Sequence, residues 1–133
     1  MDESYYREEL LDHYNNPRNK RDINDANAVA SESNPNCGDK IVVMLKIENN
    51  KIKDASFQGE GCAISMAFAS KMTEELKGKD IEEIKSLDSS FALSFFPGQI
   101  SPGRIKCALL GFSTMKHAIE KYGEKESQNK EQQ

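Results

Sequence analysis

Three cysteines and one aspartate are the residues of this sequence whose types suit metal or sulfur chemistry. Cys37 and Asp39 are separated by a single glycine, whereas Cys62 and Cys107 lie far from them and from each other along the chain. Three soft sulfurs and a carboxylate make up the four ligands of a tetrahedral site, and such a set suits zinc or an iron–sulfur cluster. Because a carboxylate is the harder ligand, we expect Asp39 to bind most weakly and to leave the metal first.

The neighbours of each cysteine indicate a reactive thiol rather than a small buried hydrophobic residue. Cys37 stands in a loop next to Gly38, whose backbone freedom can aim Cys37 and Asp39 at one point. Cys62 directly precedes a predicted helix, and Cys107 lies in the first turn or so of another. The partial positive charge of a helix N-terminus favours a thiolate, so two of the three thiols are placed to ionise.

Basic residues close to the last cysteine give the candidate site further support. Arg104 and Lys106, with Lys40 after the first pair, can offset the negative charge of three thiolates and a carboxylate. Lys106 is either a solvated charge or a group that stabilises the Cys107 thiolate or a bound persulfide. The gaps between the cysteines match no zinc finger, so spacing alone leaves two interpretations open: one shared site, or unrelated buried thiols.

The length and the charge of the chain indicate which class of protein would contain this site. The chain has 133 residues, which is the size of one ordinary domain, and 18 basic and 22 acidic residues give a net charge of -4. It lacks the dense basic patch of a nucleic-acid-binding protein and any apolar run long enough to span a membrane. The polar, acidic start is unlike a signal peptide, so we expect a cytoplasmic protein with reduced thiols.

Three segments of the sequence are predicted to be strands. Residues 41–47 are rich in Ile and Val, and residues 51–58 follow as the returning strand of a hairpin whose turn is Asn49-Asn50. Residues 26–33 are a weaker candidate for a third strand. The segment 91–96 fits neither a strand nor a helix clearly.

Apolar residues at helical spacing predict helices at both ends of the chain and in its middle. The first covers residues 4–14, the second runs from about residue 63 to Gly78, a short one reaches Leu87, and the last ends at Gly123. His13 and His117 fall in the first and last of these helices, where a lone histidine is more often structural than a ligand.

Together these elements predict an α+β fold, a small three-stranded antiparallel sheet with helices packed on one side. Residues 1–123 are expected to form the single domain. Residues 124–133 are polar and charged, and we expect them to be a disordered tail.

Four stretches of the sequence resemble the iron–sulfur cluster assembly scaffold family, which comprises the NifU-like, IscU and SufU proteins. They occur in the order of the family and extend over nearly the whole chain up to the tail. The Cys-Gly-Asp and Gly-x-Gly-Cys-x-Ile-Ser patterns are the most specific. The four stretches are Asp12–Asn19, Asn34–Asp39, Gly59–Ser65 and Arg104–Ala108.

The resemblance implies a function, partners and cargo. Members of the family receive sulfur as a persulfide from a cysteine desulfurase, build a [2Fe-2S] cluster on three cysteines and an aspartate, and pass it to acceptor proteins. Without a cluster the same site often holds zinc. By motif position these roles fall to Cys37, Asp39, Cys62 and Cys107, with Cys107 or Cys37 as the persulfide acceptor. The protein is expected to be an assembly scaffold rather than an enzyme, and a monomer or a homo-oligomer.

Two departures from the family patterns keep a second function open. Lys106 stands where the IscU branch has histidine, and the loop over residues 98–103 differs from the segment that a dedicated chaperone reads in that branch. Lysine before the last cysteine is similar to the SufU branch, whose members resemble zinc-dependent sulfur carriers. Yet the segment from Cys62 to Cys107 is too short for the insertion usual in SufU proteins. The alternative function is therefore a zinc-dependent sulfur acceptor, and a plain interaction domain with incidental thiols is the third possibility.

Overall fold

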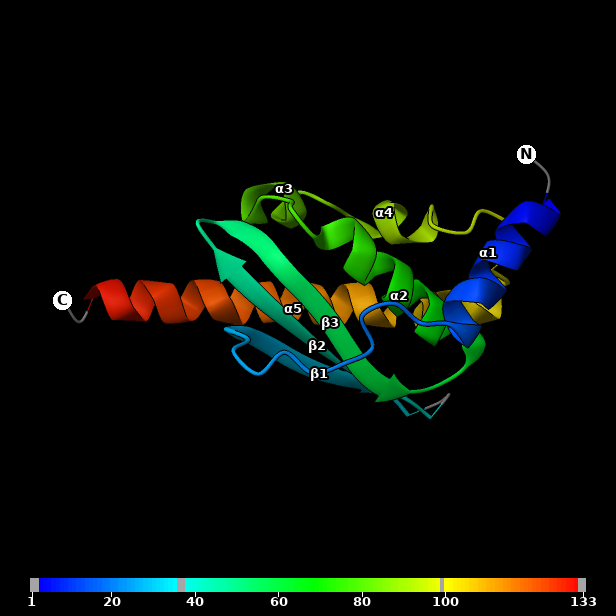
Figure 1. The fold of residues 1–133 in the computed structure, drawn as a ribbon, viewed down its shortest axis with the longest axis horizontal. Coiled ribbons are helices and arrows are strands. Elements are labelled where there is room, and N and C mark those ends of the chain that lie inside the picture. The colour runs from blue at the N-terminus through cyan, green and yellow to red at the C-terminus, as the bar shows by residue number, and fades with distance from the viewer. Residues whose placement is uncertain (1–2, 36–37, 99, 132–133) are drawn as a thin grey trace.

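A three-stranded sheet and a long C-terminal helix dominate the structure, a computed structural model that describes residues 3–35, 38–98 and 100–131 (Figure 1). The predicted ligand Cys37 lies outside the described residues. The elements, in chain order, are α1 (Glu3–Asn15), β1 (Ala28–Asn34), β2 (Asp39–Glu48), β3 (Lys51–Glu60), α2 (Ala63–Leu76), α3 (Ile81–Lys85), α4 (Ser89–Leu93), the 3-10 helix η1 (Pro102–Arg104) and α5 (Ile105–Glu131).

The sheet is antiparallel, with the strand order β1-β2-β3, which confirms the predicted α+β fold. Asn49 and Asn50 form the turn between β2 and β3, with φ angles of 53° and 65°. Asparagine tolerates this left-handed region better than most residues, which is why the pair serves as a hairpin turn. The pairing shifts register between Lys46 and Ile47, and beyond that shift Val43 faces Phe57, with both side chains fully buried in the core.

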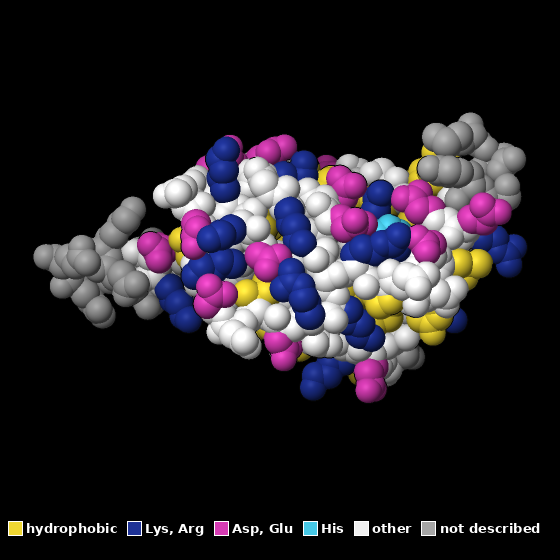
Figure 2. Space-filling model, viewed as in Figure 1, with side chains coloured by type: hydrophobic (Ala, Val, Ile, Leu, Met, Phe, Trp, Pro, Cys, Tyr) yellow, Lys and Arg dark blue, Asp and Glu magenta, His cyan; other side chains and the backbone are white. Residues whose placement is uncertain are grey.

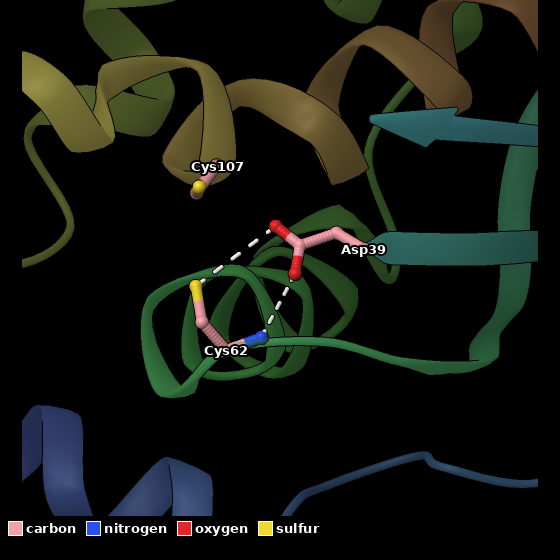
Figure 3. Close-up of side chains that lie close together, drawn as sticks. All are labelled: Asp39, Cys62 and Cys107. Atoms are coloured by element: carbon pink, nitrogen blue, oxygen red, sulfur yellow. Dashed lines mark hydrogen bonds between the residues drawn. The ribbon is translucent and has the colours of Figure 1, made fainter. Parts of the chain in front are cut away.

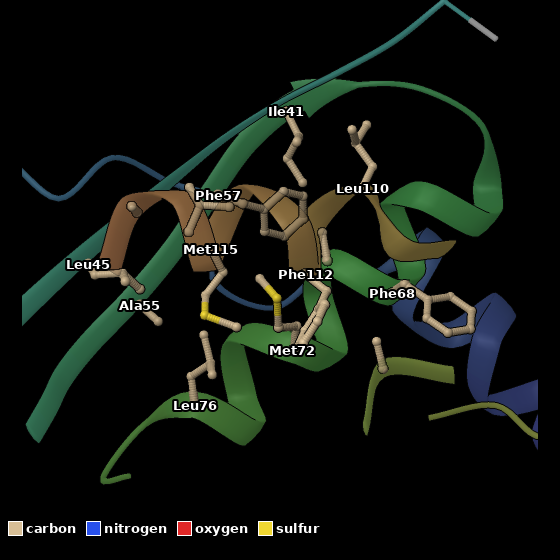
Figure 4. Packing of buried hydrophobic residues seen from close by; sticks show 14 of the residues in the cluster. Ile41, Leu45, Ala55, Phe57, Phe68, Met72, Leu76, Leu110, Phe112 and Met115 are labelled. Carbon is tan, nitrogen blue, oxygen red and sulfur yellow. The ribbon is translucent and has the colours of Figure 1, made fainter. Parts of the chain in front are cut away.

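Helices α2 and α5 cover one face of the sheet: α5 lies against β1 and β2, and α2 lies against β3 (Figure 1). Alternate residues of β2, such as Ile41 and Leu45, are fully buried against these helices. Figure 4 shows how Phe57 of β3 packs with Met72 of α2 and Met115 of α5. This shared core fixes the N-terminus of α2 and the first turn of α5 relative to the start of β2.

One detail of the sequence prediction is wrong, and one segment that was left open is now assigned. The last helix does not end at Gly123 but continues to Glu131, and one glycine within a helix costs only about 1 kcal/mol. The ambiguous segment 91–96 holds the end of the short helix α4, whose N-cap Asp88 accepts a hydrogen bond from the Ser90 amide. The division into a domain over residues 1–123 and a disordered tail over residues 124–133 stays a prediction.

None of the helices in the described part of the chain is long and apolar enough to cross a membrane.

Helix α1 is attached to α2 through a buried histidine. His13 is 3% exposed, its Nδ1 lies 2.8 Å from Ser70 Oγ, and its ring packs edge-on against Phe96. Ser70 Oγ also accepts a hydrogen bond from the Arg18 amide. The arrangement fits a neutral imidazole ring whose Nδ1 accepts a hydrogen bond from the Ser70 hydroxyl. The other ring nitrogen, Nε2, lies 3.5 Å from Glu74 Oε1.

This buried histidine predicts a loss of stability in mildly acidic solution. Burial, helped by the charge of Arg18, lowers the pKa of His13 below its usual 6.5, although Glu74 opposes the shift. The unfolded chain therefore binds the proton first, and the free energy of unfolding falls as pH drops below 6.5 until the folded-state pKa is passed. Each unit by which the pKa is lowered costs about 1.4 kcal/mol.

Urea unfolding of the wild type and of His13→Gln between pH 7.5 and 5.5 measures this effect. The wild type is expected to lose stability over that range, and the variant to change much less. An equal slope in both proteins would show that another group is responsible.

Candidate metal centre

Three of the four predicted ligands converge at one end of the sheet, although they come from distant parts of the chain. Asp39 is the first residue of β2, Cys62 is the N-cap residue of α2, and Cys107 lies in the first turn of α5. One ligand atom from each residue lies within 4.8 Å of the other two. Figure 3 shows the Asp39 carboxylate and both sulfur atoms directed toward a common point. The structure therefore brings Asp39, Cys62 and Cys107 together, and Cys37 is outside the described residues.

The Asp39 carboxylate is buried and held by the backbone of the cysteine loop. Asp39 is only 1% exposed, and its Oδ1 accepts a 2.9 Å hydrogen bond from the Cys62 amide. The second oxygen, Oδ2, lies 3.9 Å from Cys62 Sγ. A buried carboxylate needs such compensation, and here a helix N-terminus supplies both a donor and a partial positive charge.

The Cys62 thiol has a local environment that favours its thiolate. Burial on its own raises the pKa of Cys62, but hydrogen bonds from the backbone and hydroxyl of Ser65 outweigh it, so the pKa lies below the ordinary value of 9.0. Ser65 Oγ is 3.6 Å from Cys62 Sγ and also donates to the Cys62 carbonyl at 3.1 Å.

Cys107 and the supporting residues differ in their exposure. Cys107 is fully buried, whereas Arg104 at the end of η1 and Lys106, directly before Cys107 in α5, are exposed. Gly38 has a φ of 71°, in the left-handed region expected for a glycine that redirects the chain before Asp39. Sequence reasoning missed Ser65, although a hydroxyl three residues after the cysteine, in the first turn of a predicted helix, was a usable signal.

The donor set fits a thiophilic metal. Two thiols and a carboxylate lie within the reach of a single ion, and tetrahedral zinc or an iron–sulfur cluster would accept all three, with further ligands still required. The buried position of Asp39 and Cys107 limits water access, while Cys62 is partly exposed. Such a site can hold a metal or cluster and still present one sulfur to a partner.

Comparison with known proteins identifies the family to which the chain belongs. The sequence matches the NifU-like N terminal domain family over residues 5–129. It is 40% identical over 136 residues to the zinc-dependent sulfurtransferase SufU of Bacillus subtilis, covering 90% of this chain and 92% of that protein. It is 36% identical over 132 residues to the iron–sulfur cluster assembly scaffold protein IscU of Thermotoga maritima, covering 87% and 93%.

A solved structure supports the same grouping at the level of the fold. The N-terminal part of a NifU-like protein from Brucella abortus superposes with a TM-score of 0.75, covering 90% of this chain and 95% of that one, and at 20% identity the likeness concerns the fold alone. The family match covers most of the chain, so this protein belongs to the NifU-like N-terminal domain family.

Proposed function

We propose that this protein is an iron–sulfur cluster assembly scaffold, which takes sulfur from a cysteine desulfurase, builds a [2Fe-2S] cluster and transfers it to acceptor proteins. The observation that carries the proposal is the convergence of Asp39, Cys62 and Cys107 within 4.8 Å in a chain related to IscU scaffolds. Cys37, two residues before Asp39, is proposed as the remaining ligand from its motif. The cluster is cargo here, and zinc would occupy the same ligands when no cluster is bound.

The sulfur-transfer step follows from ordinary thiol chemistry. A thiolate of this chain attacks the outer sulfur of the desulfurase persulfide, the S–S bond of that persulfide breaks, and the desulfurase cysteine leaves as a thiolate. One S–S bond forms as one breaks, so the step needs no oxidant or reductant. We assign the acceptor role to Cys107 if the protein works as a scaffold, with Lys106 and Arg104 near enough in sequence to offset charge.

Asp39 is proposed as the labile ligand of the cluster. A carboxylate binds a soft metal more weakly than a thiolate does, so its departure opens a coordination position at the least cost. Figure 3 shows the Asp39 carboxylate facing both sulfur atoms, so release of its metal-binding oxygen would free a position that faces both sulfurs.

A second function is favoured by the relationship to SufU. The relative with 40% identity is a zinc-dependent sulfurtransferase, and Lys106 fits that branch. In this alternative the protein holds zinc, accepts sulfur at Cys37 and passes it on, which makes it enzyme-like rather than a scaffold.

The cytoplasm is the proposed location of both activities, because both require reduced thiols. Figure 2 shows acidic and basic side chains interspersed on one face, without the basic stripe that nucleic acid would need.

Metal and acid-labile sulfide content, measured on protein purified without oxygen and again after reconstitution with iron and a desulfurase, tests the proposal. A scaffold is expected to give equal amounts of iron and sulfide with a [2Fe-2S] visible spectrum. Wild-type protein that never assembles a cluster, yet keeps about one zinc per chain, would overturn the scaffold function in favour of the sulfur carrier. Mass spectrometry after the desulfurase reaction locates the added sulfur on the Cys107 or the Cys37 peptide, and sulfur on neither would refute both assignments.

A further inference from the structure

The residue directly before Cys62 has no room for a side chain. A Cβ atom placed on Gly61 would lie 2.5 Å from Asp39 Oδ1, 2.9 Å from Asp39 Cγ and 2.7 Å from Ser65 Oγ. Distances below 3.0 Å are not found for real Cβ atoms, so any other residue at position 61 must displace at least one of these groups. Asp39 is nearest, and it is buried, so it has little freedom to move aside.

Backbone conformation does not explain this glycine. Gly38, Gly59, Gly78 and Gly98 have positive φ angles, which is the usual reason for glycine at a turn. Gly61 has no such angle, so an alanine could adopt its backbone without strain. What glycine provides at position 61 is space, and the groups that occupy this space are the Asp39 carboxylate and the Ser65 hydroxyl.

The contacts of Asp39 show what this space achieves. Because no Cβ intervenes, Oδ1 approaches the Cys62 amide to 2.9 Å and is tied down by that hydrogen bond. The other oxygen, Oδ2, is then turned toward Cys62 Sγ at 3.9 Å and toward the side on which Cys107 lies (Figure 3). Ser65 closes the same small region from α2 and holds the Cys62 carbonyl at 3.1 Å.

We propose that Gly61, the Cys62 amide and Ser65 form a carboxylate socket, which seats Asp39 through Oδ1 and leaves only Oδ2 to coordinate metal. Gly61 is thus a positioning residue of the metal centre, acting through Asp39. The inference rests on the proposed function in so far as the site binds metal. It adds that Asp39 binds through one oxygen and keeps its hydrogen bond to Cys62 when metal leaves.

A double-mutant cycle on zinc affinity tests the socket. Gly61→Ala is expected to weaken zinc binding by about 10- to 100-fold, the range seen when groups that orient a metal ligand are lost. In the Asp39→Ala background the carboxylate is gone and only the contact with Ser65 Oγ remains, so adding Gly61→Ala is expected to reduce the affinity much less than it does in the wild type. Competition with a zinc chelator, followed on all four proteins, gives the affinities without any assay of cluster transfer.

A matched control and a second readout separate the possible outcomes. Gly103 precedes Cys107 by four residues and a Cβ there meets nothing within 4 Å, so Gly103→Ala should bind zinc like the wild type. An equal loss of affinity for Gly61→Ala in both backgrounds would mean that alanine distorts the start of α2, and would overturn the socket. Wild-type affinity in Gly61→Ala would overturn it as well. Failure of the wild type to bind zinc or a cluster would instead refute the proposed function.

In the metal-free protein, amide exchange at Cys62 provides the independent measurement. Both variants are expected to speed exchange of the Cys62 amide, because Gly61→Ala displaces its acceptor and Asp39→Ala removes it. The amides of the β2–β3 hairpin are expected to stay protected. Unchanged exchange at Cys62 in both variants would contradict the hydrogen bond on which the socket depends.

Discussion

Zinc at a thousand times its dissociation constant is expected to raise the free energy of unfolding by about 4 kcal/mol, provided that it binds the folded chain only. For a chain of this length that corresponds to an increase of about 15 °C in the melting temperature. The physical reason is that the site exists only when β2, α2 and α5 have packed together, so metal-binding free energy becomes folding free energy. Scanning calorimetry with zinc and with a chelator measures the difference.

Loss of a single sulfur ligand provides the control for this prediction. Cys62→Ala and Cys107→Ala are each expected to abolish most of the zinc-dependent rise, whatever their own effect on the metal-free protein. Cys107 is fully buried and Cys62 is not, so the metal-free baselines will differ, and the increment on adding zinc is the quantity to compare. A melting temperature that ignores zinc, or a rise that persists in Cys62→Ala, would contradict the site.

Asp39→Ala is expected to lengthen the lifetime of a bound [2Fe-2S] cluster by about tenfold or more, which is 1.4 kcal/mol in the barrier to release. The Asp39 carboxylate is buried beside Cys62 and its negative charge opposes ionisation of that thiol. Its removal relieves repulsion among the ligands and takes away the group whose departure opens the site. The decay of visible absorbance, with and without an acceptor protein, measures the lifetime.

Asp39→Asn separates the charge of this residue from its shape. The amide keeps an oxygen that accepts the Cys62 N–H but carries no charge, so a long lifetime in both variants assigns the effect to electrostatics. Faster loss of the cluster from Asp39→Ala than from the wild type would refute the labile-ligand role. A longer lifetime is compatible with weaker zinc affinity in the same variant, because the first is a rate and the second an equilibrium.

The parts of the fold that depend on local chemistry were predictable from the sequence. The Asn49-Asn50 turn marks the hairpin because asparagine tolerates positive φ, and the stripe of apolar residues in α5 follows from its period. The end of α5 was not predictable in the same way, since a glycine both ends helices and occurs within them at modest cost.

In the candidate site, too, the local features were predictable from the sequence and the features that depend on packing were not. The neighbouring residues predict that Cys62 and Cys107 lie at helix N-termini. They do not predict that the two sulfur atoms lie within 4.8 Å of each other, because this distance results from the packing of α2 and α5 on the sheet. The crowding at Gly61 also needs the fold, since Asp39 is 22 residues earlier in the numbering. His13 was expected to be structural from its position, yet its hydrogen bond to Ser70, 57 positions later in the chain, follows only from the docking of α1.

The order in which the ligands occur along the chain has a consequence for synthesis. Asp39 and Cys62 leave the ribosome well before Cys107, which belongs to the last helix of the fold. Domains are completed from the N-terminus during translation, and a nascent chain that lacks α5 holds only the earlier ligands without the face that buries them. Stable loading with zinc or a cluster is therefore expected only after α5 has been synthesised, and a product truncated before α5 is expected to bind neither.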